Sequence, residues 1–224
     1  AVQQLVAVPK QFQGALTGQF QVAGSVESFS PEAIQASGQG RLNIAGGTIT
    51  ASNIQLANGR YQGQVQTNNL PLQELVAVPR QFQGGLTGEL NVAGSVESFS
   101  PETIQATGQG RLNVAGGSIT ASNIQLAKGR YQAVVDAAGV ELNQFNEQLR
   151  GNFGGKLQVA GVLGSAKLAD VRAAGQVQLS QGIPGIERPL SAALAWNGEK
   201  LAIEQAVATG LNVSGDILTN AANN

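Results

Sequence analysis

The sequence Gly14-Ala-Leu-Thr-Gly-Gln-Phe-Gln-Val-Ala-Gly24 returns, at an offset of 70, as Gly84-Gly-Leu-Thr-Gly-Glu-Leu-Asn-Val-Ala-Gly94. The similarity runs without a gap between residues 5–66 and residues 75–136, where 62 paired positions contain 13 mismatches. A third, more divergent copy follows at an offset of 67, so that Gly108 returns as Gly175. Similarity at a fixed period is typical of a repeat array, in which each unit buries its apolar face by stacking on its neighbours. We therefore expect one continuous β array, with repeat one at 1–70, repeat two at 71–139, and a divergent third repeat and tail at 140–224.

Apolar and polar residues alternate along each repeat. In residues 15–26, for example, Leu16 and Phe20 point to one side while Thr17 and Gln19 point to the other. This period of two is typical of antiparallel sheet with a single buried face. Turn dipeptides such as Asn58-Gly59 separate the alternating segments, which indicates about four strands in each repeat.

The alternation slips once inside the repeat, in residues 48–56, because Ile49 and Ile54 fall on opposite faces. A β-bulge near Ser52-Asn53 would restore the register. Residues 70–79 are apolar without strict alternation and contain two prolines, so this segment is expected to be a connector between repeats.

Glycines lie in the middle of the apolar faces, as Gly18 does between Leu16 and Phe20. Glycine inside a strand marks a bend or a close backbone approach, and curved sheets use it for that purpose. We therefore predict an all-β fold: a curled, mostly antiparallel repeat sheet that forms an open U-shaped apolar groove. Four strands spaced by about 4.8 Å would extend this groove by roughly 19 Å per repeat.

Composition excludes several functional classes. The net charge is −1 and no run of Lys or Arg occurs, so the basic footprint of a nucleic-acid-binding protein is missing. The chain contains no Cys, His or Met, which removes the thiol nucleophile, the imidazole base and the usual zinc ligands. We expect no enzyme, no cofactor and no metal site. The missing start Met and a first residue inside a repeat suggest a piece of a longer protein, with any membrane anchor outside it.

Carboxylate pairs are the one enzymatic alternative. Glu27 and Glu32, and again Glu97 and Glu102, flank a Ser-Phe-Ser-Pro corner. Two carboxylates can form a glycosidase-like acid–base pair, but a solvated turn is the ordinary explanation for acidic residues at such a corner.

Several blocks of this sequence resemble the TamB family, and its cyanobacterial members and their counterpart at the chloroplast inner envelope in particular. These blocks are residues 14–24, Gly40-Arg-Leu-Asn-Ile-Ala-Gly-Gly-Thr-Ile49, Asn197-Gly-Glu-Lys-Leu-Ala-Ile203 and Gly210-Leu-Asn-Val-Ser-Gly215. The resemblance implies a protein anchored in the inner membrane that crosses the periplasm toward an outer-membrane barrel assembly protein. It also implies kinship with AsmA-like, bridge-like lipid-transfer proteins, whose curled sheet, called a β-taco, holds acyl chains. Family members are linked to outer-membrane protein assembly and, in chloroplasts, to protein import.

Together, the two-faced strands and this resemblance predict a groove that carries phospholipid or another acyl lipid between the inner and outer membranes. The residues expected to line it are Leu16, Phe20, Val22, Val26, Ile34, Leu42, Ile44, Ile49, Tyr61, Val65, Leu86, Leu90, Val92, Val96, Ile104, Leu112, Val114, Ile119, Tyr131, Val135, Leu157, Val159, Val177 and Leu179.

Three other interpretations of the pattern remain open from sequence. The same apolar residues are compatible with the core of a closed sandwich or solenoid. Gly-Gly-Thr-Ile-Thr and strands rich in Gln and Asn also occur in surface β-solenoids of adhesin or structural type, although a β-helix should show a shorter basic period. An outer-membrane barrel shares the alternation in segments of roughly ten residues, but its aromatic girdles need more than the ten aromatics of this chain (seven Phe, two Tyr and one Trp).

Overall fold

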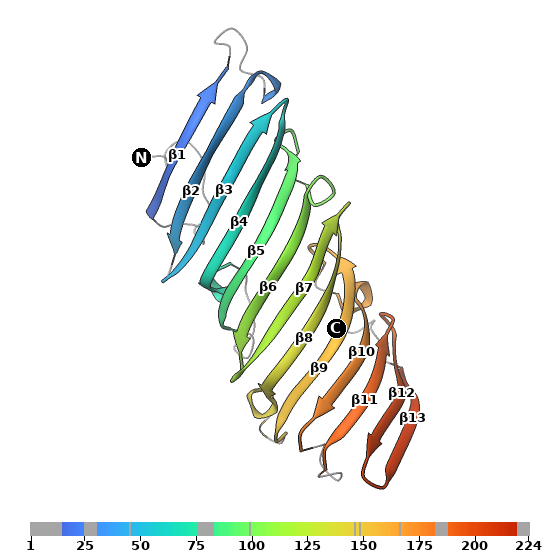
Figure 1. Cartoon of the computed structure of the whole chain (residues 1–224). Coiled ribbons are helices and arrows are strands. Elements are labelled where there is room, and N and C mark those ends of the chain that lie inside the picture. The colour runs from blue at the N-terminus through green and yellow to red at the C-terminus, as the bar shows by residue number, and fades with distance from the viewer. Residues whose placement is uncertain are drawn as a thin grey trace.

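The computed structural model describes residues 15–24, 31–44, 46–75, 83–98, 100–145, 147, 149–165, 167–181 and 188–218. Their strands form one sheet of 13 strands in the order of the chain, from β1 at one end to β13 at the other (Figure 1). Every neighbouring pair is antiparallel. The predicted fold class is therefore confirmed as a curled antiparallel sheet of the taco type, open at both ends.

The strands of the first two copies correspond one to one. In the first copy they are β1 (Ala15–Ala23), β2 (Gln35–Ile44), β3 (Gly47–Ala57) and β4 (Arg60–Pro71). In the second they are β5 (Gly85–Ser95), β6 (Gln105–Val114), β7 (Gly117–Ala127) and β8 (Arg130–Glu141). The remaining strands are β9 (Asn152–Val162), β10 (Arg172–Leu179), β11 (Leu190–Trp196), β12 (Lys200–Ala208) and β13 (Leu211–Leu218).

The helical elements are single turns: α1 (Leu72–Leu75), η3 (Pro31–Ala33), η5 (Leu142–Gln144) and η6 (Leu168–Asp170). None of the helices in the described segments is both long and apolar enough to cross a membrane.

The sheet is a single layer. The whole chain has an accessible surface of 14618 Å², whereas a compact monomer of this mass would expose about 9,600 Å². Across the described ranges, the strands pack against no second sheet and no long helix. A closed sandwich and a β-solenoid with parallel coils are thus both excluded as folds of these residues.

A β-bulge lies at the predicted place in β3. Gly40 pairs with Ala51 and Gly38 with Ile54, so two residues of β3 face one of β2. Asn53, inside this bulge, has a φ of 52°, and its counterpart Asn123 also has 52°. Asparagine tolerates the left-handed region better than other residues with a side chain, which explains its presence here. The bulge returns Ile54 to the face that carries Ile49.

The expected connector at residues 70–79 is wrong at its start, because Leu70 and Pro71 belong to β4 and pair with Leu86 and Gly85. The cause is a second irregularity between Thr67 and Leu70, which returns Leu70 to the apolar side. The helical turn α1 then follows, and residues 76–79 lie outside the described residues.

The most buried side chains lie near the ends of the even-numbered strands. Leu70 has no exposed surface, and Ile44, Val114 and Val140 are 3–4% exposed. A backbone hydrogen bond of 2.9 Å from Leu72 to the Gly84 carbonyl folds the chain back at this side of the sheet. One long side of the array is therefore packed, although the sheet has only one layer.

Candidate functional site

Cross-strand register brings apolar residues of all thirteen strands to one face. Residues directly opposite each other in an antiparallel pair share a face, so the pairing can be followed from strand to strand. One such row consists of Leu16, Leu42, Ile49, Thr67, Gly88, Gly110, Ala121, Val135, Leu157, Gly175, Leu194, Ile203 and Gly215. We call the face that carries this row the apolar face, and the opposite one the polar face.

The apolar face contains no charged residue in any of the thirteen described strands. Its only side chains with a polar group are Thr67, Tyr61, Tyr131 and Trp196. Thirteen strands have twelve spacings of about 4.8 Å, which makes the face about 58 Å long. The polar face is different, because Arg, Glu and amide side chains are frequent on it.

The structure brings most of the predicted groove residues together on this face. Twenty of the 24 lie in strands there. Ile34, Val96 and Ile104 lie just outside strand ends, and Val26 lies outside the described residues.

The prediction missed Leu70, Val140 and Phe153 on the apolar face, together with two further groups of residues there. The first consists of Ile54, Leu56, Ile124 and Leu126, which the bulges of β3 and β7 bring to this face. The phase slip in the sequence was the signal for them. The second group comes from the C-terminal strands and includes Leu194, Trp196, Leu201 and Ile203, which follow the part of the chain where the repeat is recognisable.

Several mid-strand glycines on the apolar face mark close approaches between strands. A Cβ at Gly18 would lie 2.6 Å from the carbonyl oxygen of Gln39. The same contact recurs at Gly88 with Gln109, at 2.7 Å, and at Gly155 with Gln176, at 2.5 Å. Since carbon and carbonyl oxygen normally approach to about 3.3 Å, only glycine fits at these places. The predicted close backbone approach is confirmed at these three glycines, whereas a Cβ at the mid-strand Gly40 or Gly63 would meet its nearest atom at an ordinary 3.4 or 3.5 Å.

Tyrosine rings join each copy to the next. Tyr61 in β4 lies opposite Gly94 in β5, and a Cβ at Gly94 would be 2.5 Å from the Tyr61 hydroxyl. Tyr131 covers Gly161 in the same way, at 2.6 Å. An aromatic ring laid over a cross-strand glycine shields its backbone, which stabilises the pairing.

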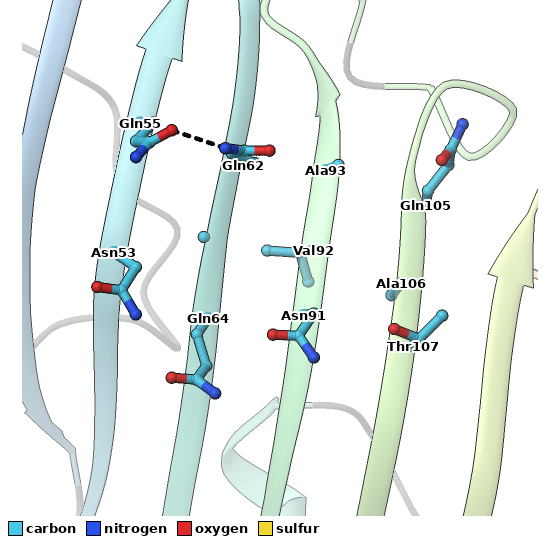
Figure 2. Close-up of a pocket in the computed structure, with 11 residues that line it drawn as sticks. Asn53, Gln55, Gln62, Gln64, Asn91, Val92, Ala93, Gln105, Ala106 and Thr107 are labelled. Carbon is cyan, nitrogen blue, oxygen red and sulfur yellow. Dashed lines mark hydrogen bonds between the residues drawn. The ribbon is translucent and has the colours of Figure 1, made fainter.

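The polar face carries a hollow at the junction of the first two copies, with a volume of about 390 Å³. Figure 2 shows the amide side chains around it, which come from β3 to β6. Gln62 Nε2 donates a hydrogen bond of 2.6 Å to Gln55 Oε1, and Gln64 donates one to Glu89. Amides neither give nor take a proton at neutral pH, so this hollow offers hydrogen bonds but no acid–base pair.

A matching hollow of about 420 Å³ lies at the next junction. Gln132, Val134 and Ala160 take the places of Gln62, Gln64 and Ala93 in it. The twist of the repeated sheet thus forms the hollow twice, while its lining changes from amides to mainly small apolar residues.

Among the corner carboxylates, Glu32 of the first copy contacts Glu97 of the second, while Glu27 lies outside the described residues. The protonated Glu97 carboxyl donates a hydrogen bond to Glu32, and this bond, together with the like charge of Glu32, raises the pKa of Glu97 above its ordinary value. The neighbouring Glu102 behaves oppositely, because its own backbone N–H and the Ser100 hydroxyl lower the pKa of its carboxyl. These groups are at the surface and next to a turn, and the segments described bring no three potential metal-ligating side chains together.

Comparison of the chain with protein-family models, with curated proteins and with solved structures gives no match. The resemblance to the TamB family accordingly stays a prediction, and the function must be argued from the two faces of the sheet.

Proposed function

We propose that the apolar face binds the acyl chains of phospholipid or another lipid. The observation that carries this proposal is the uncharged row that crosses all thirteen strands in a sheet with no covering layer among the described residues. Exposed apolar patches on soluble proteins rarely exceed a few hundred square ångströms, and larger ones mark binding sites or aggregation hazards. A strip about 58 Å long needs an apolar occupant.

Acyl chains suit this face for energetic reasons. Each methylene removed from water contributes about 0.8 kcal/mol, so about ten methylenes contribute about 8 kcal/mol before the loss of chain entropy. The face offers no charge or side-chain amide along its described length, and its only polar groups are the hydroxyls of Thr67, Tyr61 and Tyr131 and the indole N–H of Trp196. An acyl chain therefore meets no charged group that would hold it at one position. The proposed role is therefore conduction along the face, without catalysis.

The family resemblance extends this proposal to the whole protein. The chain would be a segment of a periplasmic, TamB-like protein that carries lipid between inner and outer membranes and contributes to outer-membrane biogenesis. Its anchor in the inner membrane would lie outside these residues, and its partner would be an outer-membrane barrel assembly protein. These parts rest on the sequence blocks quoted above.

A matched pair of variants tests the proposal. Val134 and Val135 are neighbours in β8, are both half-buried, and point to the polar and the apolar face respectively. We expect Val135→Asp to reduce binding of a fluorophore-labelled C16 fatty acid about tenfold or more, and Val134→Asp to leave it unchanged. Val135→Thr is a milder variant for the case in which the aspartate prevents folding, which circular dichroism would reveal.

Lipid extraction and mass spectrometry should also find phospholipid on chain purified from membranes in mild detergent. Equal binding by the two aspartate variants, or chain that carries no lipid and takes up no fatty acid, would contradict the proposal.

A further inference from the structure

The outer edge of β1 resembles the edge at which β5 pairs with β4 in the same sheet. β1 pairs with β2 in the register in which β5 pairs with β6, as Leu16 opposite Leu42 and Leu86 opposite Leu112 show. The other side of β5 pairs with β4. Within the described segments, β1 has no second neighbour. β1 thus has the same kind of edge that β5 uses to pair with β4, but none of the described strands pairs with it.

The contacts that β4 makes with β5 have counterparts on β1. The backbone N–H of Asn69 donates a hydrogen bond of 3.1 Å to the Thr87 hydroxyl, and β1 has Thr17 at the position of Thr87. The Tyr61 ring lies over Gly94, and Gly24 takes the place of this glycine. Both the side-chain acceptor and the site for an aromatic ring are therefore present on β1.

Exposure distinguishes the two strands. Leu16, Phe20 and Val22 are 57%, 53% and 69% exposed, whereas Leu86, Leu90 and Val92 are half-buried between β4 and β6. Unpaired strand edges with exposed apolar residues are templates for another strand. β1 therefore exposes apolar side chains whose counterparts on β5 are partly buried beside β4.

We propose that the outer edge of β1 is a β-augmentation site for a strand of the β4 type from another copy of this repeat. On the side of the apolar face, the β4 pattern is Tyr61, Gly63, Val65 and Thr67, followed by the bulge and Leu70. Main-chain hydrogen bonds hold the segment, and the tyrosine over Gly24 fixes its register. The site is inferred from strand pairing and does not require that the apolar face bind lipid.

A peptide with the sequence of residues 58–71 tests the site on the whole chain. We expect the labelled peptide to bind, and to slow amide hydrogen exchange in β1 while β13, the other edge strand, exchanges as before. The matched control has the same composition with neighbouring residues exchanged in pairs, so that its apolar side chains face the polar side. Its affinity should be lower by about tenfold or more.

A size-complementation experiment identifies the register. A Cβ at Gly24 meets its nearest atom, the Ala33 carbonyl oxygen, at an ordinary 3.4 Å, so Gly24→Ala is compatible with the chain itself. It obstructs the tyrosine of a docked peptide, because a Cβ at the equivalent Gly94 lies 2.5 Å from the Tyr61 hydroxyl. We expect Gly24→Ala to weaken peptide binding about tenfold or more, and the peptide variant Tyr61→Ala to restore it.

Three outcomes would overturn the proposal: equal affinity of the two peptides, protection of β13 instead of β1, or a dimer of the chain through β1 that the peptide does not displace. Gly24→Ala adds no charge or polar group to the sheet, so we expect it to leave fatty-acid binding in the assay above unchanged. Failure of the β-augmentation proposal is therefore distinct from failure of the lipid proposal.

Discussion

Gly88 and Gly110 lie directly opposite each other on β5 and β6, yet the structure predicts opposite effects for the same substitution at the two sites. A Cβ at Gly88 would be 2.7 Å from the Gln109 carbonyl oxygen and 2.9 Å from the Gly110 Cα. A Cβ at Gly110 would meet its nearest atom, the Thr87 carbonyl oxygen, at 3.7 Å. Gly110 therefore has room for a methyl group and Gly88 has none.

The distances set the magnitudes. Relieving the contact at Gly88 to about 3.3 Å requires the two strands to separate locally by about 0.6 Å, which weakens the ladder hydrogen bonds beside it. Overpacking of this kind typically costs about 1–3 kcal/mol. Gly→Ala at an unstrained site instead stabilises by about 0.4–1 kcal/mol, because the unfolded chain loses freedom. We expect Gly88→Ala to be less stable than Gly110→Ala by about 2 kcal/mol or more.

Urea denaturation of both variants measures this difference. Because an array can open locally, hydrogen exchange in β5 and β6 should accompany it and should report faster exchange in Gly88→Ala only. Equal stability of the two variants, or a larger loss in Gly110→Ala, would refute the assignment of these glycines to a close strand approach.

Three further predictions concern the turns, the corner and the packed side of the sheet. Lys128 has a φ of 52° at the hairpin position that Asn58 occupies in the first copy, so Lys128→Asn should raise the free energy of unfolding by about 0.5–1 kcal/mol, seen in urea titrations. Glu32→Gln should lower the pKa of Glu97 toward its ordinary value in a carboxyl NMR titration. In the unmodified chain, the raised pKa of Glu97 stabilises the folded corner at a pH below the ordinary pKa of a glutamate. This stabilisation is lost as the pH rises through the pKa that Glu97 has in the folded chain. Leu70→Ala should cost about 2–5 kcal/mol, since this side chain has no exposed surface, whereas a cost under about 1 kcal/mol would contradict its packing.

The sequence predicts the strands, their faces and one bulge because these features depend on local alternation. The phase slip between Ile49 and Ile54 is visible because both flanking residues are apolar, and the structure places the bulge there. The irregularity before Leu70 is of the same kind, but it follows Thr67, whose polar side chain conceals the slip. From the alternation alone, β4 is therefore predicted to end before Leu70, although the strand continues to Pro71.

Features that depend on several strands at once were not predictable from one sequence. The hollow on the polar face is lined by residues from β3 to β6, and its depth depends on how these strands twist past one another. Likewise, the ring of Tyr61 and Gly94 are far apart in the sequence, and their contact follows from the register of β4 on β5. Neither glycine nor tyrosine alone indicates its partner.

Each of the first two copies contributes four strands, from β1 to β4 and from β5 to β8, and four is an even number. In an antiparallel sheet, a unit with an even number of strands ends on the side where it began. The first strand of the next unit therefore runs in the same direction as its own first strand, meets the same kind of edge, and its connector emerges on the same side. Unequal crossing-over between the two copies in a gene would add or remove one whole repeat and leave every junction of the β4–β5 type intact. A unit of three or five strands would reverse all that follows it. The number of copies is thus free to change during evolution without any new interface having to arise.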